Sequence, residues 1–100
     1  MANFQLSFLA EQDFRNIATY TIRAWSVAQS LRYIDALESC CELIAENPQI
    51  GRRCDSIEPG LRRMEEGKHV IFYKTDGKGV QIVRILHANM DPERNMIRPN

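Results

Sequence analysis

The stretch KHVIFYKTDGKGVQIVRILH, residues 68–87, determines the fold of this chain. It contains two apolar runs rich in β-branched and aromatic residues, which the short segment TDGKG separates. Glycine-containing connections of this length typically join the two strands of a hairpin. A third run, LRRME at residues 61–65, comes before them and ends at a turn formed by Glu66 and Gly67. The pattern therefore predicts a three-stranded antiparallel meander.

The last two runs carry apolar side chains on both faces of the predicted sheet. Because successive side chains of a strand alternate, we expect Ile82 and Leu86 on one face and Val83 and Ile85 on the other. An antiparallel sheet with two apolar faces needs two covers. Helices should cover one face, and we expect the other to be an open apolar patch that marks a partner site. The alternatives are that the C-terminal tail covers it, or that the helices spread over both faces.

The first half of the chain predicts a short strand and two helices. The segment NFQLSF, residues 3–8, alternates apolar and polar residues as a half-buried strand does. Ser7 can cap a helix that reaches about Trp25, and Ser26 with Gln29 forms a capping box that starts a second helix at once. Pro48 ends the second helix. So short a connection implies an antiparallel helical hairpin. The predicted fold class is α+β, in the order strand, two helices, three strands.

Each predicted helix carries an apolar stripe at three- and four-residue steps, which we expect to be buried. In the first helix the stripe consists of Phe14, Ile17, Ala18, Thr21, Ile22 and Trp25. In the second it consists of Val27, Leu31, Ile34, Leu37, Cys41 and Ile44. We interpret Trp25, at the corner, as a core residue rather than a partner anchor. The segment QIGRRCDSIEPG, residues 49–60, contains two glycines and a proline and is predicted to be a loop leading to the strands.

Length and composition indicate one globular domain over residues 1–100. The chain has 100 residues, is 44% hydrophobic and 26% charged, and contains no apolar run long enough for a membrane helix. The N-terminus has no basic region followed by an apolar one, so we expect a cytoplasmic protein. Residues 91–100 form a tail that could fold back on the sheet or remain free. Cys40, Cys41 and Cys54 lack the spacing of a zinc site or a disulfide framework, so we expect reduced, buried thiols, no metal and no cofactor.

The charges are unevenly distributed, although the net charge is +0. The chain is acidic up to Ile50 and mildly basic from Gly51 to His87. This asymmetry suits an acidic partner or a nucleic-acid backbone, and an ordinary solvated surface explains it equally well. A plain nucleic-acid-binding module is disfavoured, because the chain lacks both a basic excess and an interleaved aromatic platform.

One group of residues could carry chemistry. Cleavage of RNA through its 2′-OH needs an acid, a base and cationic donors for the phosphate. Arg63 and Arg84 could contact phosphate, Lys68 could add charge, and His87 could act as acid or base. However, Arg84 and His87 are three residues apart and point to opposite faces of an ideal strand. The sequence also contains no phosphate-binding loop and no HExxH motif.

Four segments carry a family resemblance: ENPQIGR at residues 46–52, GLRR at 60–63, GKHVIFYK at 67–74 and VRILHANMD at 83–91. Together, in this order and spacing, they resemble the ParE branch of the ParE/RelE superfamily of bacterial toxin-antitoxin modules, from about Phe4 to Asp91. The resemblance implies a helical hairpin on an antiparallel sheet. It also implies a toxin that a ParD-like antitoxin neutralises by wrapping its C-terminal segment around it, which would cover the second apolar face.

The resemblance leaves two activities to consider. ParE-like toxins block DNA gyrase, a type II topoisomerase, whereas RelE-like relatives cut mRNA on the ribosome. We expect gyrase inhibition by protein contact, without catalytic residues, direct nucleic-acid binding or membrane association, and a toxin-antitoxin hetero-oligomer. Contacts to antitoxin or target are expected from Arg62, Arg63, Lys68, Tyr73, Arg84 and His87. In the alternative, a ribosome-dependent endoribonuclease, the catalytic residues would be Arg63, Arg84 and His87.

Overall fold

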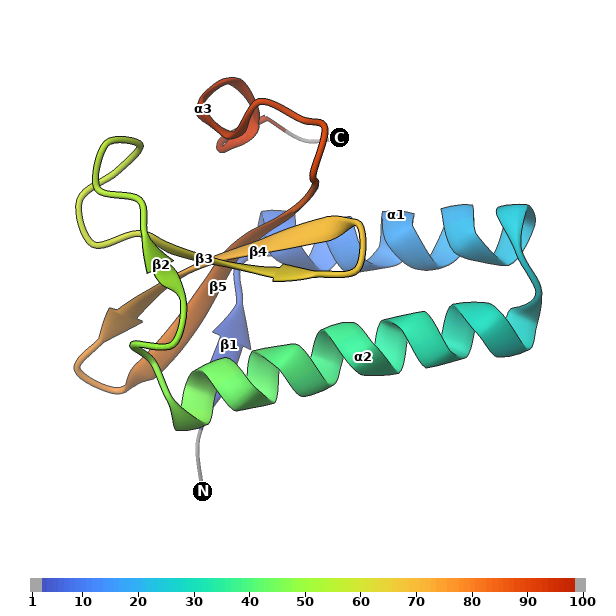
Figure 1. Cartoon of the computed structure of the whole chain (residues 1–100), viewed down its shortest axis with the longest axis horizontal. Coiled ribbons are helices and arrows are strands. Elements are labelled where there is room, and N and C mark those ends of the chain that lie inside the picture. Colours follow the sequence, from blue (N-terminus) through green and yellow to red (C-terminus); the bar gives the residue numbers. More distant parts are fainter. Residues whose placement is uncertain (1–2, 99–100) are drawn as a thin grey trace.

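The computed structural model describes residues 3–98 and has the predicted α+β order (Figure 1). Its elements are β1 (Phe4–Leu6), α1 (Phe8–Ala24), α2 (Val27–Glu46), β2 (Arg52–Arg53), β3 (Arg62–Glu66), β4 (His69–Asp76), β5 (Gly79–His87) and α3 (Pro92–Asn95). None of the helices in this part of the chain has the length and hydrophobicity to cross a membrane.

The strands form one mixed sheet in the order β1-β5-β4-β3-β2. Strands β3, β4 and β5 pair antiparallel, which confirms the predicted meander. Strand β1 pairs parallel to β5, so the first strand of the chain lies beside the last one. Strand β2 is not evident from the sequence, which predicts a loop for its residues. Its two residues pair with β3 at the opposite edge, a ladder too short to leave a periodic pattern.

The two helices form the predicted antiparallel hairpin and lie together along one side of the sheet (Figure 1). The predicted caps are confirmed. The Ser7 hydroxyl accepts a hydrogen bond from the Ala10 N–H at 3.0 Å, and the Ser26 hydroxyl accepts one from the Gln29 N–H at 3.0 Å. Ser7 also donates to the Val83 carbonyl at 2.7 Å, so the start of α1 is fixed to β5.

The buried stripes are shorter than the sequence predicts. Ile17 and Thr21 of α1 and Leu37, Cys41 and Ile44 of α2 are buried. Ile22, Val27 and Leu31 are exposed, contrary to prediction. They belong to the end of the hairpin next to the connection between the helices, which projects beyond the sheet (Figure 1). Trp25 is half-buried there, and its ring packs edge-on against Tyr33 with centroids 5.4 Å apart.

A β-bulge sets which residues of β5 face the helices. Phe72 pairs with Arg84, but the next residue, Tyr73, pairs with Ile82, so Val83 is an extra residue on β5. Ile82 and Ile85 therefore both join the core under the helices, although the alternation placed them on opposite faces. Val83 instead packs with Leu86 on the other face. The predicted division of these side chains was wrong because a bulge changes the alternation of faces.

The second apolar face exists, but the chain covers it itself. Its cluster consists of Cys54, Leu61, Val70, Phe72, Leu86 and Met96. Cys54 and Leu61 flank the excursion between β2 and β3, and Met96 follows α3 in the C-terminal segment. The expectation of an open patch for a partner is thus incorrect, and the alternative of a tail that folds back is confirmed.

Candidate functional site

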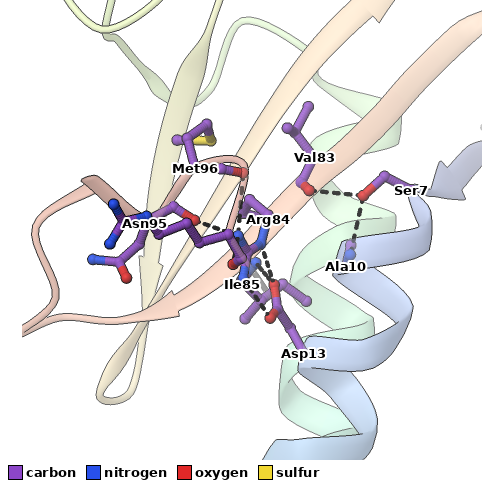
Figure 2. A network of polar contacts seen from close by, with 9 residues as sticks. Ser7, Ala10, Asp13, Val83, Arg84, Ile85, Asn95 and Met96 are labelled. Atoms are coloured by element: carbon purple, nitrogen blue, oxygen red, sulfur yellow. Dashed lines mark hydrogen bonds and ion pairs between the residues drawn. The ribbon is translucent and has the colours of Figure 1, made fainter. Parts of the chain in front are cut away.

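Arg84 is a buried structural residue in this fold (Figure 2). Its side chain is 0% exposed, and its Nε and one Nη atom donate to the two carboxylate oxygens of Asp13 at 2.8 and 2.9 Å. The other Nη atom donates to the carbonyls of Asn95, Met96 and Arg98 in the C-terminal segment. Arg84 therefore joins α1 to the tail and is not on the surface, where a partner contact had been expected.

Asp13 is not among the residues that the sequence singles out for the site. Its carboxylate also accepts the backbone N–H of Ile85 at 2.9 Å, so it holds both the side chain of Arg84 and the backbone of β5. It was not predicted to belong to the apolar stripe of the first helix. A signal was nevertheless present, because Asp13 lies four residues before Ile17 and hence on the same buried face. A carboxylate on a buried stripe requires a buried cation or several donors.

Tyr73 is likewise a core residue. Its hydroxyl donates to the Pro48 carbonyl at 2.8 Å and accepts from the Gly51 N–H at 2.8 Å, and its ring is 0% exposed. A Cβ atom on Gly51 would stand 2.6 Å from this hydroxyl, so only glycine fits there. These contacts connect the end of α2 to the sheet, and Tyr73 has no exposed surface to offer a partner.

His87 lies opposite His69 on the neighbouring strand, and their rings are 5.4 Å apart between centroids. His69 Nδ1 is also within hydrogen-bond distance of the Tyr33 hydroxyl, 2.5 Å away. Burial lowers the pKa of His69 to about 4, and the adjacent His87 contributes to this shift. The two imidazoles thus belong to an aromatic row that begins at Trp25 and runs through Tyr33.

The three residues of the ribonuclease alternative are not brought together. Arg63 and Arg84 both pair across the sheet with Phe72, whereas His87 pairs with His69. Because residues 69 and 72 are three apart on β4, the histidine points to the opposite face from the arginines. The bend after Leu86 does not bring His87 round to them, a possibility that the sequence left open.

The remaining predicted residues lie at or near the surface of β3 and its turn. Arg62 donates through Nη1 to the Gly51 carbonyl at 2.7 Å. The Arg63 guanidinium lies over the Phe72 ring, 5.4 Å from its centroid. Lys68 is exposed in the turn between β3 and β4. These three side chains stay accessible to a partner, unlike Arg84 and Tyr73.

The cysteines are buried and not disulfide-bonded, as predicted. Burial raises the pKa of the Cys40 thiol to about 11 and that of Cys41 to about 12. Both thiols therefore stay protonated near neutral pH and are poor nucleophiles. Within residues 3–98, no three histidine, cysteine, aspartate or glutamate side chains gather closely enough to hold a metal ion.

An open apolar groove of about 570 Å³ lies between β1 and the helical hairpin. We call it the hairpin groove, and its lining consists of Phe4, Leu6, Glu11, Phe14, Arg15, Ala18, Ile34 and Glu38. The exposed side chains of Ile22 and Leu31 lie one helical turn from Ala18 and Ile34, toward the connection between the helices. They extend the apolar surface beyond the groove. An apolar surface of this extent with charges at its edge is typical of a protein-binding site.

Comparison with known proteins identifies the family. Residues 4–92 match the model for the ParE toxin of type II toxin-antitoxin system, parDE. The chain is 38% identical over 96 residues to Toxin ParE1 of Mycobacterium tuberculosis, covering 95% of this chain and 98% of that toxin. It is 35% identical over 96 residues to Toxin ParE1 of Caulobacter vibrioides, covering 96% and 99%.

A solved structure agrees with the fold. A chain of the chromosomal ParDE toxin-antitoxin system from P. aeruginosa superposes with a TM-score of 0.73, at 19% identity over 87% of this chain and 96% of that one. The resemblance first suggested by four short segments thus extends over nearly the whole length of the relatives. The chain belongs to the ParE toxin family of type II toxin-antitoxin systems.

Proposed function

We propose that this toxin inhibits DNA gyrase by protein contact, in the cytoplasm, rather than by cutting RNA. The observation that carries the proposal is the separation of Arg63, Arg84 and His87. Arg84 is enclosed by Asp13 and the tail, and His87 faces His69. A ribonuclease needs its acid, base and cationic donors around one phosphate. In this chain the three candidate residues lie in different parts of the fold. Family membership supports the same activity, because the ParE branch is the one that targets gyrase.

The proposed contacts to the target or antitoxin are the predicted residues that keep some exposed surface, namely Arg62, Arg63, Lys68 and His87. Arg84 and Tyr73 support binding only indirectly. Arg84 holds the C-terminal segment against the sheet, and Tyr73 fixes the end of α2. Substitution of either would affect partner binding through the stability of the fold.

A supercoiling assay next to a ribosome assay distinguishes the two activities. The purified toxin should inhibit gyrase supercoiling at a near-stoichiometric ratio and leave ribosome-bound mRNA intact. A His87→Ala variant should still inhibit gyrase, weakened at most by the loss of one contact. Ribosome-dependent cleavage of mRNA that His87→Ala abolishes would contradict the proposal and favour the endoribonuclease.

For the antitoxin, the proposed binding site is the hairpin groove. The P. aeruginosa structure is described as a ParDE toxin-antitoxin system, which supports a ParD-like partner for this chain as well. An amphipathic segment of that partner can bury its apolar side chains between α1 and α2. Glu11, Arg15 and Glu38 at the edge can pair with its charged residues and set its direction. The antitoxin would thus cover the helical side of the toxin, instead of the sheet face that residues 54–61 and Met96 occupy.

A matched pair of exposed residues tests this surface. Leu31 is 58% exposed beside the groove, so Leu31→Asp should fold and weaken antitoxin binding about tenfold or more, because loss of a buried apolar contact costs roughly 1–3 kcal/mol. Tyr20 is 67% exposed but lies two residues from both Ala18 and Ile22, or about 200° around α1. Tyr20→Asp should bind as the parent does. Equal affinity of the two variants, measured by calorimetry, would refute the assignment.

A further inference from the structure

The short ladder between β2 and β3 contains two pairs of directly opposed arginines. Arg52 faces Arg63, and Arg53 faces Arg62. Like charges directly across a ladder destabilise the sheet. Four guanidinium groups at one sheet edge are therefore costly unless each finds acceptors.

Three of these four guanidinium groups have hydrogen-bond acceptors within the chain. Arg52, Arg53 and Arg62 bond to the Glu65 carboxylate, the Asp55 carboxylate and the Gly51 carbonyl, respectively. Arg63 differs. Its Nε atom lies 3.6 Å from Glu65 Oε1, close enough for an ion pair but too far for a hydrogen bond.

Arg63 keeps a donor unused in a fixed position. Within residues 3–98, its buried Nε atom has no hydrogen-bond partner. Such orphaned donors are rare in folded proteins, so the Arg63 guanidinium is less completely satisfied within the chain than its three neighbours. The ring of Phe72 supports the guanidinium on one face, and 29% of the Arg63 side chain remains exposed. The group is thus held in place while part of it faces solvent.

The surface in front of Arg63 is a small pocket. It has a volume of about 270 Å³, and its lining consists of Arg52, Arg53, Cys54, Ser56, Ile57 and Arg63. Cys54 and Ile57 belong to the cluster on the sheet face away from the helices. This arginine pocket therefore lies on a different side of the molecule from the hairpin groove, and a partner in the groove would leave it open.

We propose that the arginine pocket receives an acidic side chain of a protein partner, whose carboxylate accepts a pair of hydrogen bonds from the Arg63 guanidinium. The planar fork of arginine matches a carboxylate in this way. Arg52 and Arg53 also line the pocket, but Glu65 and Asp55 pair with them, so one positive charge remains in excess, which matches a single carboxylate. The Ser56 hydroxyl can supply a further donor. The site extends the proposed function by a second contact surface, and it would persist if gyrase proved not to be the target.

A nucleic-acid phosphate fits the pocket less well. Asp55 and Glu65 neutralise two of the pocket's three arginines, and the one positive charge in excess is too little for a chain of phosphates. The protein also has a net charge of +0, whereas binding to a nucleic-acid backbone draws its affinity from several neutralised phosphates. A single carboxylate needs only the exposed part of the Arg63 guanidinium.

Nuclear magnetic resonance of the arginine side chains tests the proposal. In the ¹⁵N-labelled full chain, the Nε–Hε signal of Arg63 should shift saturably as a capped tri-glutamate peptide is added. The signal of Arg23, exposed in the last turn of α1, should not, and serves as the internal control. Arg63→Lys keeps the charge but loses the fork, so the peptide should then bind at least about tenfold more weakly, with Arg23→Lys unchanged. An unshifted Arg63 signal, or an equal shift at Arg23, would overturn the proposal.

A second variant leaves Arg63 itself intact. Glu65→Gln removes the negative charge that pairs with both Arg63 and Arg52. Its amide oxygen can still accept a hydrogen bond from Arg52, so the ladder between β2 and β3 should keep this acceptor. Peptide affinity should rise roughly two- to fivefold, the value of an exposed ion pair. Unchanged or weaker affinity would count against the site. A short DNA duplex that shifted the Arg63 signal at lower concentration than the peptide would also overturn the assignment, in favour of phosphate.

Discussion

Replacement of Arg84 by methionine is expected to be among the most destabilising single changes in this chain. Arg84 and Asp13 are 0% and 1% exposed and share two hydrogen bonds of 2.8 and 2.9 Å. Methionine fills similar space but leaves the Asp13 carboxylate buried without this cation. Removal of one partner of a buried pair costs about 3–5 kcal/mol. The carbonyls of Met96 and Arg98 would lose their donor as well, so the C-terminal segment should loosen.

The assay is urea unfolding monitored by circular dichroism, and thermal unfolding is measured in parallel. A domain of this size loses roughly 4–8 °C in Tm per kcal/mol, so Arg84→Met should lower Tm by about 12 °C or more. Arg15→Met is the control, because Arg15 forms only an exposed pair with Glu11 at 4.0 Å, worth at most about 0.5 kcal/mol. The double variant Asp13→Leu, Arg84→Met should recover part of the loss, since no buried charge remains. A cost below about 1 kcal/mol for Arg84→Met would refute the structural role.

Three further outcomes are expected. Ser7→Ala should cost about 1–2 kcal/mol in urea unfolding, because it removes both the cap of α1 and the bond to Val83, and a cost near zero would show that neither matters. Gly51→Ala should destabilise by about 1–3 kcal/mol, because its Cβ would lie 2.6 Å from the Tyr73 hydroxyl, and a neutral result would contradict the close contact. The folded-state pKa of His69, about 4, lies below its usual 6.5, so the unfolded chain takes up the proton first and stability should fall as pH decreases from about 6.5 to about 4. Titration of His69 by NMR checks this directly, and a midpoint near 6.5 would be inconsistent with burial.

The local parts of the fold were predictable because their signals are local. Ser7 and Ser26 mark two helix starts, and the glycine-containing segment at residues 75–79 marks a hairpin. The pairing of β1 with β5 could not be predicted, since the partners are separated by 76 positions in the sequence and nothing near either strand specifies the other. The bulge at Val83 also leaves no mark in a run that is largely apolar, so the facing of Ile82 and Ile85 could not be assigned.

The candidate site was less predictable than the fold. An arginine in a strand is normally exposed, and the burial of Arg84 depends on Asp13, which is 71 residues away. Arg63 could be named as a contact residue from the sequence alone. Its unused Nε donor could not be predicted, because it depends on how the other three arginines are paired. The apolar surface beside the hairpin groove arises because Ile22 and Leu31 project past the sheet, and helical periodicity alone assigns such residues to the core.

Gyrase inhibition by this toxin is tested most simply by titrating gyrase supercoiling with the purified protein. We predict loss of supercoiling at a toxin-to-gyrase ratio near one, and recovery when a ParD-like antitoxin is added. Leu31→Asp should inhibit gyrase as the parent does but require more antitoxin for recovery. Full supercoiling at a large molar excess of folded toxin would contradict inhibition by contact with gyrase.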